Sequence, residues 1–289
     1  MQWLILSLLT AVAVSSQDAC IRKFFSGLSP VEMSVYPLMY SLPLFTLSAL
    51  LVPVPPIGPD FLWSFLISIP LNGFTFVLYM KAIKISPLSL AIPCLAFTPV
   101  FVVLSGYLFL DEIPGIGGFC GIVLICAGGY VLHIDPGHWH LLAPLQSLFR
   151  EKGSRIMLFV AFVYSLTSVI GKKAILNSSP LFFTMLFYMV FNLLMILFFR
   201  MSGRIRLTAF RNDAAKGLAA GVLLFLHGLF HGWAISLVQA AYMISVKRLS
   251  VVISVLYGRF LFKEENTSFR LSGAVLMFAG TLLVTLQGK

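Results

Sequence analysis

The most constraining feature of this chain is a repeat of its own sequence. Residues 100–132 align without a gap with residues 252–284, at a constant offset of 152 positions. The alignment superposes glycines and acidic residues: Gly106 on Gly258, Glu112 on Glu264, Gly121 on Gly273 and Gly128 on Gly280. Each copy reads as an apolar helix, an acidic turn and a second apolar helix. Such a duplication is typical of secondary transporters, whose substrate binds between the copies.

The composition excludes a soluble protein. Hydrophobic residues make up 59% of the chain, charged residues only 10%, and the mean hydropathy is +0.98. Crossing the hydrocarbon core takes about 20 helical residues. Stretches of this kind occur at about 2–22, 31–52, 61–82, 86–109, 115–133, 155–176, 180–200, 215–236, 239–262 and 269–287. We therefore expect an all-α membrane protein with ten transmembrane helices. Little chain remains for a catalytic domain outside the membrane, so we expect no enzyme.

The spans divide into two halves. Residues 1–133 form the first five-helix repeat, 134–154 a polar connecting loop, and 155–289 the second repeat. Five is an odd number, so the second half enters the membrane with the opposite orientation. The prediction is two inverted five-helix repeats, the geometry that alternating access uses.

Charged residues outside the spans indicate orientation. Most loop lysines and arginines lie on the side opposite the N-terminus, which places both termini outside the cytoplasm by the positive-inside rule. The first span has no basic residue before it, so we interpret it as part of the fold rather than a signal peptide. The net charge of +10 comes from loops and spans, and we expect no nucleic-acid partner.

A pattern of residues that the two halves share resembles that of a known protein family. The first helix ends in Lys23 before Ser29-Pro30, and the sixth in Lys173 before Ser179-Pro180. Together with the repeated glycine–acidic turns, this resembles the EamA branch of the drug/metabolite transporter superfamily. The resemblance implies a ten-helix inverted-repeat bundle with a central cavity that moves small organic solutes.

A Lys-Arg pair narrows the resemblance. Lys247-Arg248 in the ninth span, with Lys173 or its neighbour Lys172 in the sixth, is similar to the sugar-phosphate translocators of the same superfamily, where such groups hold the substrate phosphate. In the related small multidrug transporters, a glutamate eight positions before the helix-one lysine binds protons and cationic drugs. Here that position is Ser15, which argues against that mechanism and makes Ser15 a candidate substrate contact.

Charge burial gives an independent argument for an anion site. Lys247 and Arg248 fall near the middle of their span, where a charge costs at least about 2.5–3.5 kcal/mol. Arg259 follows Arg248 by eleven residues, which predicts that both share a helix face. The functional hypothesis is a site for a carboxylate or phosphate. The alternative is a structural ion pair with Asp18, which we interpret as either a coupling group or a fixed counter-ion.

Other polar residues are weaker candidates. His227 and His231 are four apart and project from one helix face, so they suit a cavity wall, a metal pair or helix packing. We add Tyr79 and Tyr242 as substrate contacts, and we predict no metal and no cofactor. Glu112 and Glu264 are expected to cap the next helix. Pro93 and Pro99 are expected to kink the fourth span.

We therefore expect a carrier of a small, anionic metabolite, acting as a monomer in the lipid bilayer of the cell membrane, such as a bacterial inner membrane. The cavity is predicted between the first, third, sixth, eighth and ninth spans. Three alternatives stay open: an exporter of amino acids or other neutral or zwitterionic metabolites, an intramembrane metalloenzyme, and a lipid flippase.

Overall fold

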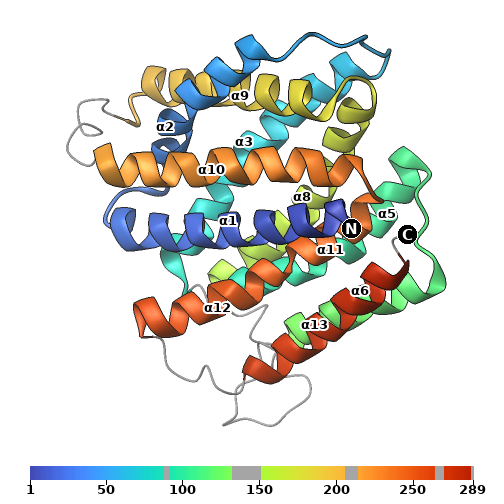
Figure 1. The fold of residues 1–289 in the computed structure, drawn as a ribbon. Coiled ribbons are helices and arrows are strands. Elements are labelled where there is room, and N and C mark those ends of the chain that lie inside the picture. Colours follow the sequence, from blue (N-terminus) through green and yellow to red (C-terminus); the bar gives the residue numbers. More distant parts are fainter. Residues whose placement is uncertain (88–90, 132–150, 206–213, 264–269, 288–289) are drawn as a thin grey trace.

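A computed structural model describes residues 1–87, 91–131, 151–205, 214–263 and 270–287, and Figure 1 shows its bundle of helices. Seven apolar segments are long enough to cross a membrane. Six are single helices: α1 (Gln2–Phe25), α2 (Pro30–Leu51), α3 (Phe61–Ile85), α8 (Lys152–Leu176), α9 (Pro180–Met201) and α10 (Ala214–Ser236). The seventh is the segment Ala240–Phe262, which is interrupted.

Three shorter apolar segments complete the set of ten. The fourth span consists of the 3₁₀ helix η1 (Ile92–Phe97) and α5 (Thr98–Leu110), and the fifth span is α6 (Ile116–Val131). The ninth span consists of α11 (Ala240–Lys247) and α12 (Leu249–Phe262), and the tenth span is α13 (Arg270–Gln287). The prediction of an all-α membrane protein with ten spans is confirmed. The expected kink of the fourth span at Pro93 and Pro99 is present as the junction of η1 and α5. The ninth span, expected as one helix, is interrupted near the same aligned position.

Local sequence explains where the helices begin and end. Ser29 and Ser179 cap α2 and α9, and each is followed by a proline at the first helical position. Asp111 and Lys263, aligned in the repeat, both adopt the left-handed conformation, with φ of 54° and 52°. Their amides bond back to the carbonyls of the aligned glycines at 106 and 258, which ends α5 and α12 alike.

The glycines of α6 and α13 show how the two copies are related. A Cβ on Gly121 would lie 2.7 Å from the carbonyl oxygen of Gly280, and one on Gly128 would lie 2.6 Å from that of Gly273. Rising numbers in α6 therefore meet falling numbers in α13, so these adjacent helices are antiparallel (Figure 1). Since these glycines are aligned in the repeat, the contact has the exchanged pattern of a two-fold axis. This is the geometry of inverted repeats.

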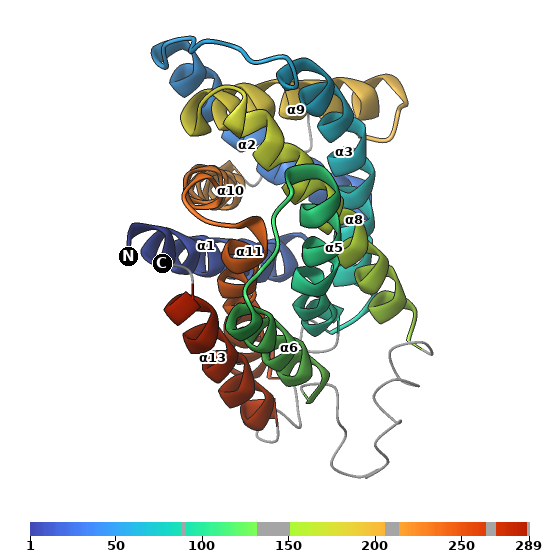
Figure 2. The same cartoon turned by 90° about the vertical axis from the view of Figure 1, so that its right-hand side faces the viewer.

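The same exchange organises the rest of the bundle. α1 packs on α10 of the other copy, and α8 packs on the equivalent helix α3. α2 packs on α9, its own equivalent, where the Asn192 side chain donates to Ser41 Oγ at 2.9 Å. Figure 2 shows α11 between α1 and α5, with α6 and α13 paired below. The seam between the copies therefore runs through the centre of the bundle.

We predict that Gly121→Ala destabilises the protein, because the added methyl group overlaps the backbone of Gly280. Overpacking of this kind costs about 1–3 kcal/mol. Thermal unfolding in detergent should give a lower Tm. Gly27→Ala is the matched control, since a Cβ there has no neighbour within 4 Å. An equal Tm for the two variants would contradict the close packing.

Candidate functional site

The site is built around the interruption of the ninth span. α11 ends at Lys247 and α12 begins at Leu249, with Arg248 between them at φ −68° and ψ −7°. The Arg248 amide shares its regular helical acceptor, the carbonyl of Ile244, with the carbonyl of Ser245, both at 3.1 Å. The Val251 amide then donates to the Arg248 carbonyl at 2.9 Å, three residues back instead of four. Irregular backbone at membrane depth is tolerated where it is covered by protein or lines a cavity. The interruption places two consecutive cations at one point of the seam.

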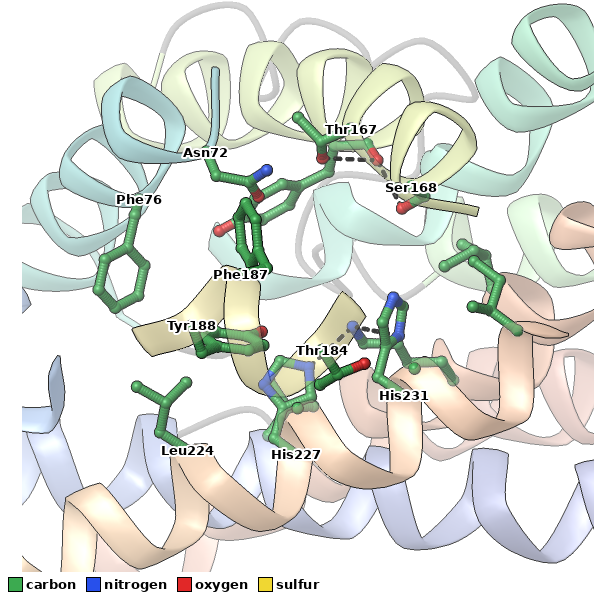
Figure 3. Close-up of a pocket in the computed structure, with 18 of the residues that line it drawn as sticks. Asn72, Phe76, Thr167, Ser168, Thr184, Phe187, Tyr188, Leu224, His227 and His231 are labelled. Atoms are coloured by element: carbon green, nitrogen blue, oxygen red, sulfur yellow. Dashed lines mark hydrogen bonds between the residues drawn. The ribbon is translucent and has the colours of Figure 1, made fainter. Parts of the chain in front are cut away.

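Lys247 is held by the two histidines of α10. Its Nζ lies 2.9 Å from His227 Nε2 and 3.3 Å from His231 Nδ1, and Figure 3 shows both rings projecting from α10 toward α9. An ammonium group only donates, so these ring nitrogens accept and the protons sit on the other nitrogens. His227 Nδ1 then carries a proton, and this N–H has no hydrogen-bond acceptor among the described residues. The histidines solvate the lysine without neutralising it.

Arg248 lies beside them with its charge unpaired. Its side chain is 5% exposed, and Nε has no hydrogen-bond partner among the residues that the structure describes. In the described residues, no salt bridge joins a carboxylate to Arg248 or to Lys247. Asp18 is also buried, but its Oδ2 accepts from the Tyr79 hydroxyl and its Oδ1 has no partner. The ion pair with Asp18, which was the alternative interpretation of these cations, is therefore not formed.

These groups surround a cavity of about 160 Å³, close to the volume that holds a benzene ring. Its lining combines the cations with rings and polar groups: Gln17, Asp18, Asn72, Tyr79, Tyr164, Thr167, Ser168, Thr184, Phe187, Tyr188 and Phe191. The lining residues of α8 and α10 run from mid-helix to their C-terminal ends, on the side where α1 begins. The cavity thus lies between the copies, toward the N-terminal side of the membrane.

Comparison with known proteins gives the family. The model of the EamA-like transporter family matches residues 1–134 and again residues 152–286. The chain belongs to the EamA-like transporter family. A solved crystal structure has a similar fold, with a TM-score of 0.61 and 14% identity over 99% of this chain and 95% of the other. The search of curated proteins found no match. The chain is thus a multi-pass membrane transporter of the drug/metabolite type.

In this EamA-like transporter the cavity unites most of the predicted site residues. Asp18, Tyr79, His227, His231, Lys247 and Arg248 all line it. The predicted walls, from the first, third, sixth, eighth and ninth spans, are present, and α2, η1 and α9 add to them. Sequence reasoning missed Thr184 and Tyr188 of α9, shown in Figure 3. The signal was weak, because one threonine and one tyrosine stand among many phenylalanines.

Three predicted contacts lie elsewhere. The Tyr242 hydroxyl accepts from the Gly115 amide at 3.1 Å, at the seam on the N-terminal side of the cavity. Ser15 donates to the carbonyls of Ala11 and Ser250, the second at 2.8 Å, and so supports the backbone just after the interruption. Lys173 points away from the cavity, because neighbouring helical residues differ by about 100° in direction. Lys172 lines the cavity in its place.

Lys173 belongs to a cluster at the start of α3. Its Nζ lies 3.3 Å from Asp60 Oδ2 and 5.2 Å from the centre of the Trp63 ring. The Trp63 indole donates to Asp60 Oδ1 at 2.8 Å. This hydrogen bond, followed by the contact with Lys173, lowers the pKa of Asp60. The cluster ties the end of α8 to the start of α3.

Two further expectations concern the helix ends. Arg259 is exposed beside the Phe260 ring near the end of α12, eleven residues and about 16 Å along the helix from Arg248. Glu112 does cap a helix, but the helix is α11 of the other copy, whose Ala240 amide donates to Oε2 at 2.8 Å. The predicted cap at Glu264 lies outside the described residues.

Histidine replacement tests whether the imidazoles serve Lys247. His227→Leu removes an acceptor from a buried ammonium, which costs about 1–3 kcal/mol of unfolding free energy. Adding Lys247→Met removes the charge that needed the acceptor, so the double variant should regain most of the lost Tm. Additive losses in the two variants would contradict this role.

In the described residues no cluster of three or more His, Cys, Asp or Glu could hold a metal ion.

Proposed function

We propose that this EamA-like transporter carries a small organic anion, bearing a carboxylate or a phosphate, by alternating access through the central cavity. The observation that carries the proposal is the cationic pair at the interruption of the ninth span. Lys247 and Arg248 line the cavity, and within the described residues neither forms a salt bridge. A bound anionic solute provides the negative charge that pairs with these two cations.

The charge balance supports an anion whatever the state of the one nearby acid. Lys247 and Arg248 together carry two positive charges, and an ionised Asp18 returns one. The site therefore keeps a net positive charge when Asp18 is ionised and gains another when it is protonated. This makes Asp18 suitable as a coupling group as well as a counter-ion, since its proton changes the attraction for an anion.

The walls indicate the body of the solute. The aromatic rings of Tyr164, Phe187 and Tyr188 face a space that fits about one ring, while Asn72 and Thr184 offer hydrogen bonds. Figure 3 shows Thr184 and Tyr188 beside the histidines, with Phe187 and Asn72 farther toward α3. We infer a compact solute with an apolar body and one acidic group, held by an Arg fork and a Lys point charge.

Transport itself follows from the inverted repeat. Two copies related by a two-fold axis can exchange their conformations, which opens the shared site to one side and then to the other. One chain surrounds the cavity, so we infer that the monomer is the working unit, and we assign it to the cell membrane. An exporter of amino acids is the second candidate, because His227 Nδ1, which has no hydrogen-bond partner in the described residues, and the polar side chain of Asn72 also suit a zwitterion.

Binding of benzoate, with benzamide as its neutral isostere, tests the proposal. We expect purified protein to bind benzoate and not benzamide. Lys247→Gln and Arg248→Gln should each weaken benzoate binding about 10- to 100-fold, the effect of losing a hydrogen bond to a charged group worth about 1.5–3 kcal/mol. Isothermal titration and uptake into proteoliposomes give the two readouts.

Lys173→Gln is the matched control, because Lys173 is a neighbouring lysine that pairs with Asp60 outside the cavity. It should leave benzoate binding unchanged. Unaltered benzoate affinity in both cavity variants would contradict the proposal. Binding of phenylalanine together with no binding of benzoate would favour the amino-acid exporter.

A further inference from the structure

A turn of the first copy is fastened to the start of α11 in the second. The turn follows α5, and in Figure 2 it runs beside α11. Glu112 accepts from the Ala240 amide at 2.8 Å, and the Gln239 side chain donates to the carbonyl of Ile113 at 3.3 Å. The Tyr242 hydroxyl adds the contact with Gly115 described above. These bonds all cross the seam on the N-terminal side of the cavity.

Lys172 completes this fastening from α8. Its ammonium donates to Glu112 Oε1 and to the carbonyl of Val238, the latter at 2.6 Å. The side chains of Lys172 and Glu112 are only 6% and 18% exposed. Lys172 also lines the cavity. One ion pair therefore joins three segments at the N-terminal end of the cavity: the turn after α5, the end of α8 and the connection into α11.

α11 links this ion pair to the cations of the site. The helix has eight residues, with Ala240 bonded to Glu112 at its first position and Lys247 bonded to the histidines at its last. At 1.5 Å per residue these ends are about 11 Å apart. A helix this short moves as one piece, so displacement of Ala240 is transmitted to Lys247.

The repeat shows a related contact at the other side of the membrane. Lys172 aligns with Arg22, and Val238 aligns with Ser86. Arg22 Nη1 donates to the carbonyl of Ser86 at 2.8 Å, just as Lys172 donates to Val238. In inverted repeats, equivalent positions lie on opposite sides of the membrane. Each end of the bundle thus has a cation that holds the connection into the interrupted span.

We propose that the Glu112–Lys172 pair is the gate of the cavity on the N-terminal side, and that α11 couples this gate to Lys247. With the pair intact, the turn, α8 and α11 are held together and the seam is closed. When it separates, α11 is released at its first turn and the cavity opens to that side. The inference concerns transport in general and does not depend on the charge of the solute.

Cysteine labelling tests the gate. The four native cysteines are replaced, and Ser168→Cys is introduced as a reporter because Ser168 lines the cavity. The protein is reconstituted in vesicles selected for an N-terminal tag facing outward, and a membrane-impermeant maleimide is added outside. Glu112→Gln and Lys172→Met should each raise the labelling rate about tenfold, which corresponds to about 1.4 kcal/mol in the opening equilibrium.

The controls separate a gate from general loosening. Lys173→Gln breaks the adjacent ion pair with Asp60 and should leave the labelling rate unchanged. The Glu112→Gln, Lys172→Met double variant should label no faster than Lys172→Met alone, because Lys172→Met already removes the contact with Glu112. Maleimide trapped inside the vesicles should label the gate variants no faster than the parent.

Two results would overturn the proposal: labelling from the N-terminal side that matches the parent in both gate variants, or equal acceleration from both sides. If Glu112→Gln does not fold, Lys172→Met decides alone, since it leaves the cap on Ala240 in place. No solute is present in this assay. Failure of benzoate to bind would therefore count against the anionic substrate and leave the gate standing.

Discussion

The uncompensated charge of Lys247 and Arg248 is the constraint on which the rest of the site depends. A charge within the membrane needs water, dipoles or an opposite charge. Here the histidines of α10 supply dipoles to Lys247, whereas Arg248 receives no protein acceptor at Nε. The cavity and its solute therefore complete the coordination of these cations. The walls can be assembled around them because α11 and α12 separate at this point.

The two copies share a backbone plan but differ in chemistry. The fourth span is interrupted between η1 and α5, as the ninth is between α11 and α12. At the positions aligned with Lys247 and Arg248, the first copy has Leu95 and Ala96. Duplication thus produced two interrupted spans facing one cavity, and only the second received cations. An asymmetric site on a symmetric frame lets one solute be held while the copies exchange conformations.

Much of the fold could be predicted because its causes are local or periodic. Span length, the offset of 152 and the odd number of spans per half are properties of the sequence itself, and they led to inverted repeats. The aligned glycines lie at the close backbone contact between α6 and α13. Lys247, Arg248 and the histidines were found because polar groups are costly in apolar spans.

The remaining features depend on tertiary contacts that no local pattern encodes. Whether Lys172 or Lys173 faces inward is decided by the rotation of α8, which the neighbouring helices set. Arg259 was expected to act with Arg248 because both were placed on one helix face, but α12 carries Arg259 about 16 Å away from Arg248, to an exposed position. The bond from Glu112 to Ala240 joins residues 128 positions apart, in different copies. Such contacts can be identified only from the three-dimensional packing of the two copies.

The most direct test of the cationic cavity is a structure of the transporter with bromine-substituted benzoate. The account predicts anomalous density for bromine among the rings of Tyr164, Phe187 and Tyr188. It also predicts the carboxylate within hydrogen-bonding distance of Arg248 and Lys247. Bromine bound only at the lipid-facing surface, or an unliganded structure in which Asp18 forms a salt bridge with Arg248, would contradict it.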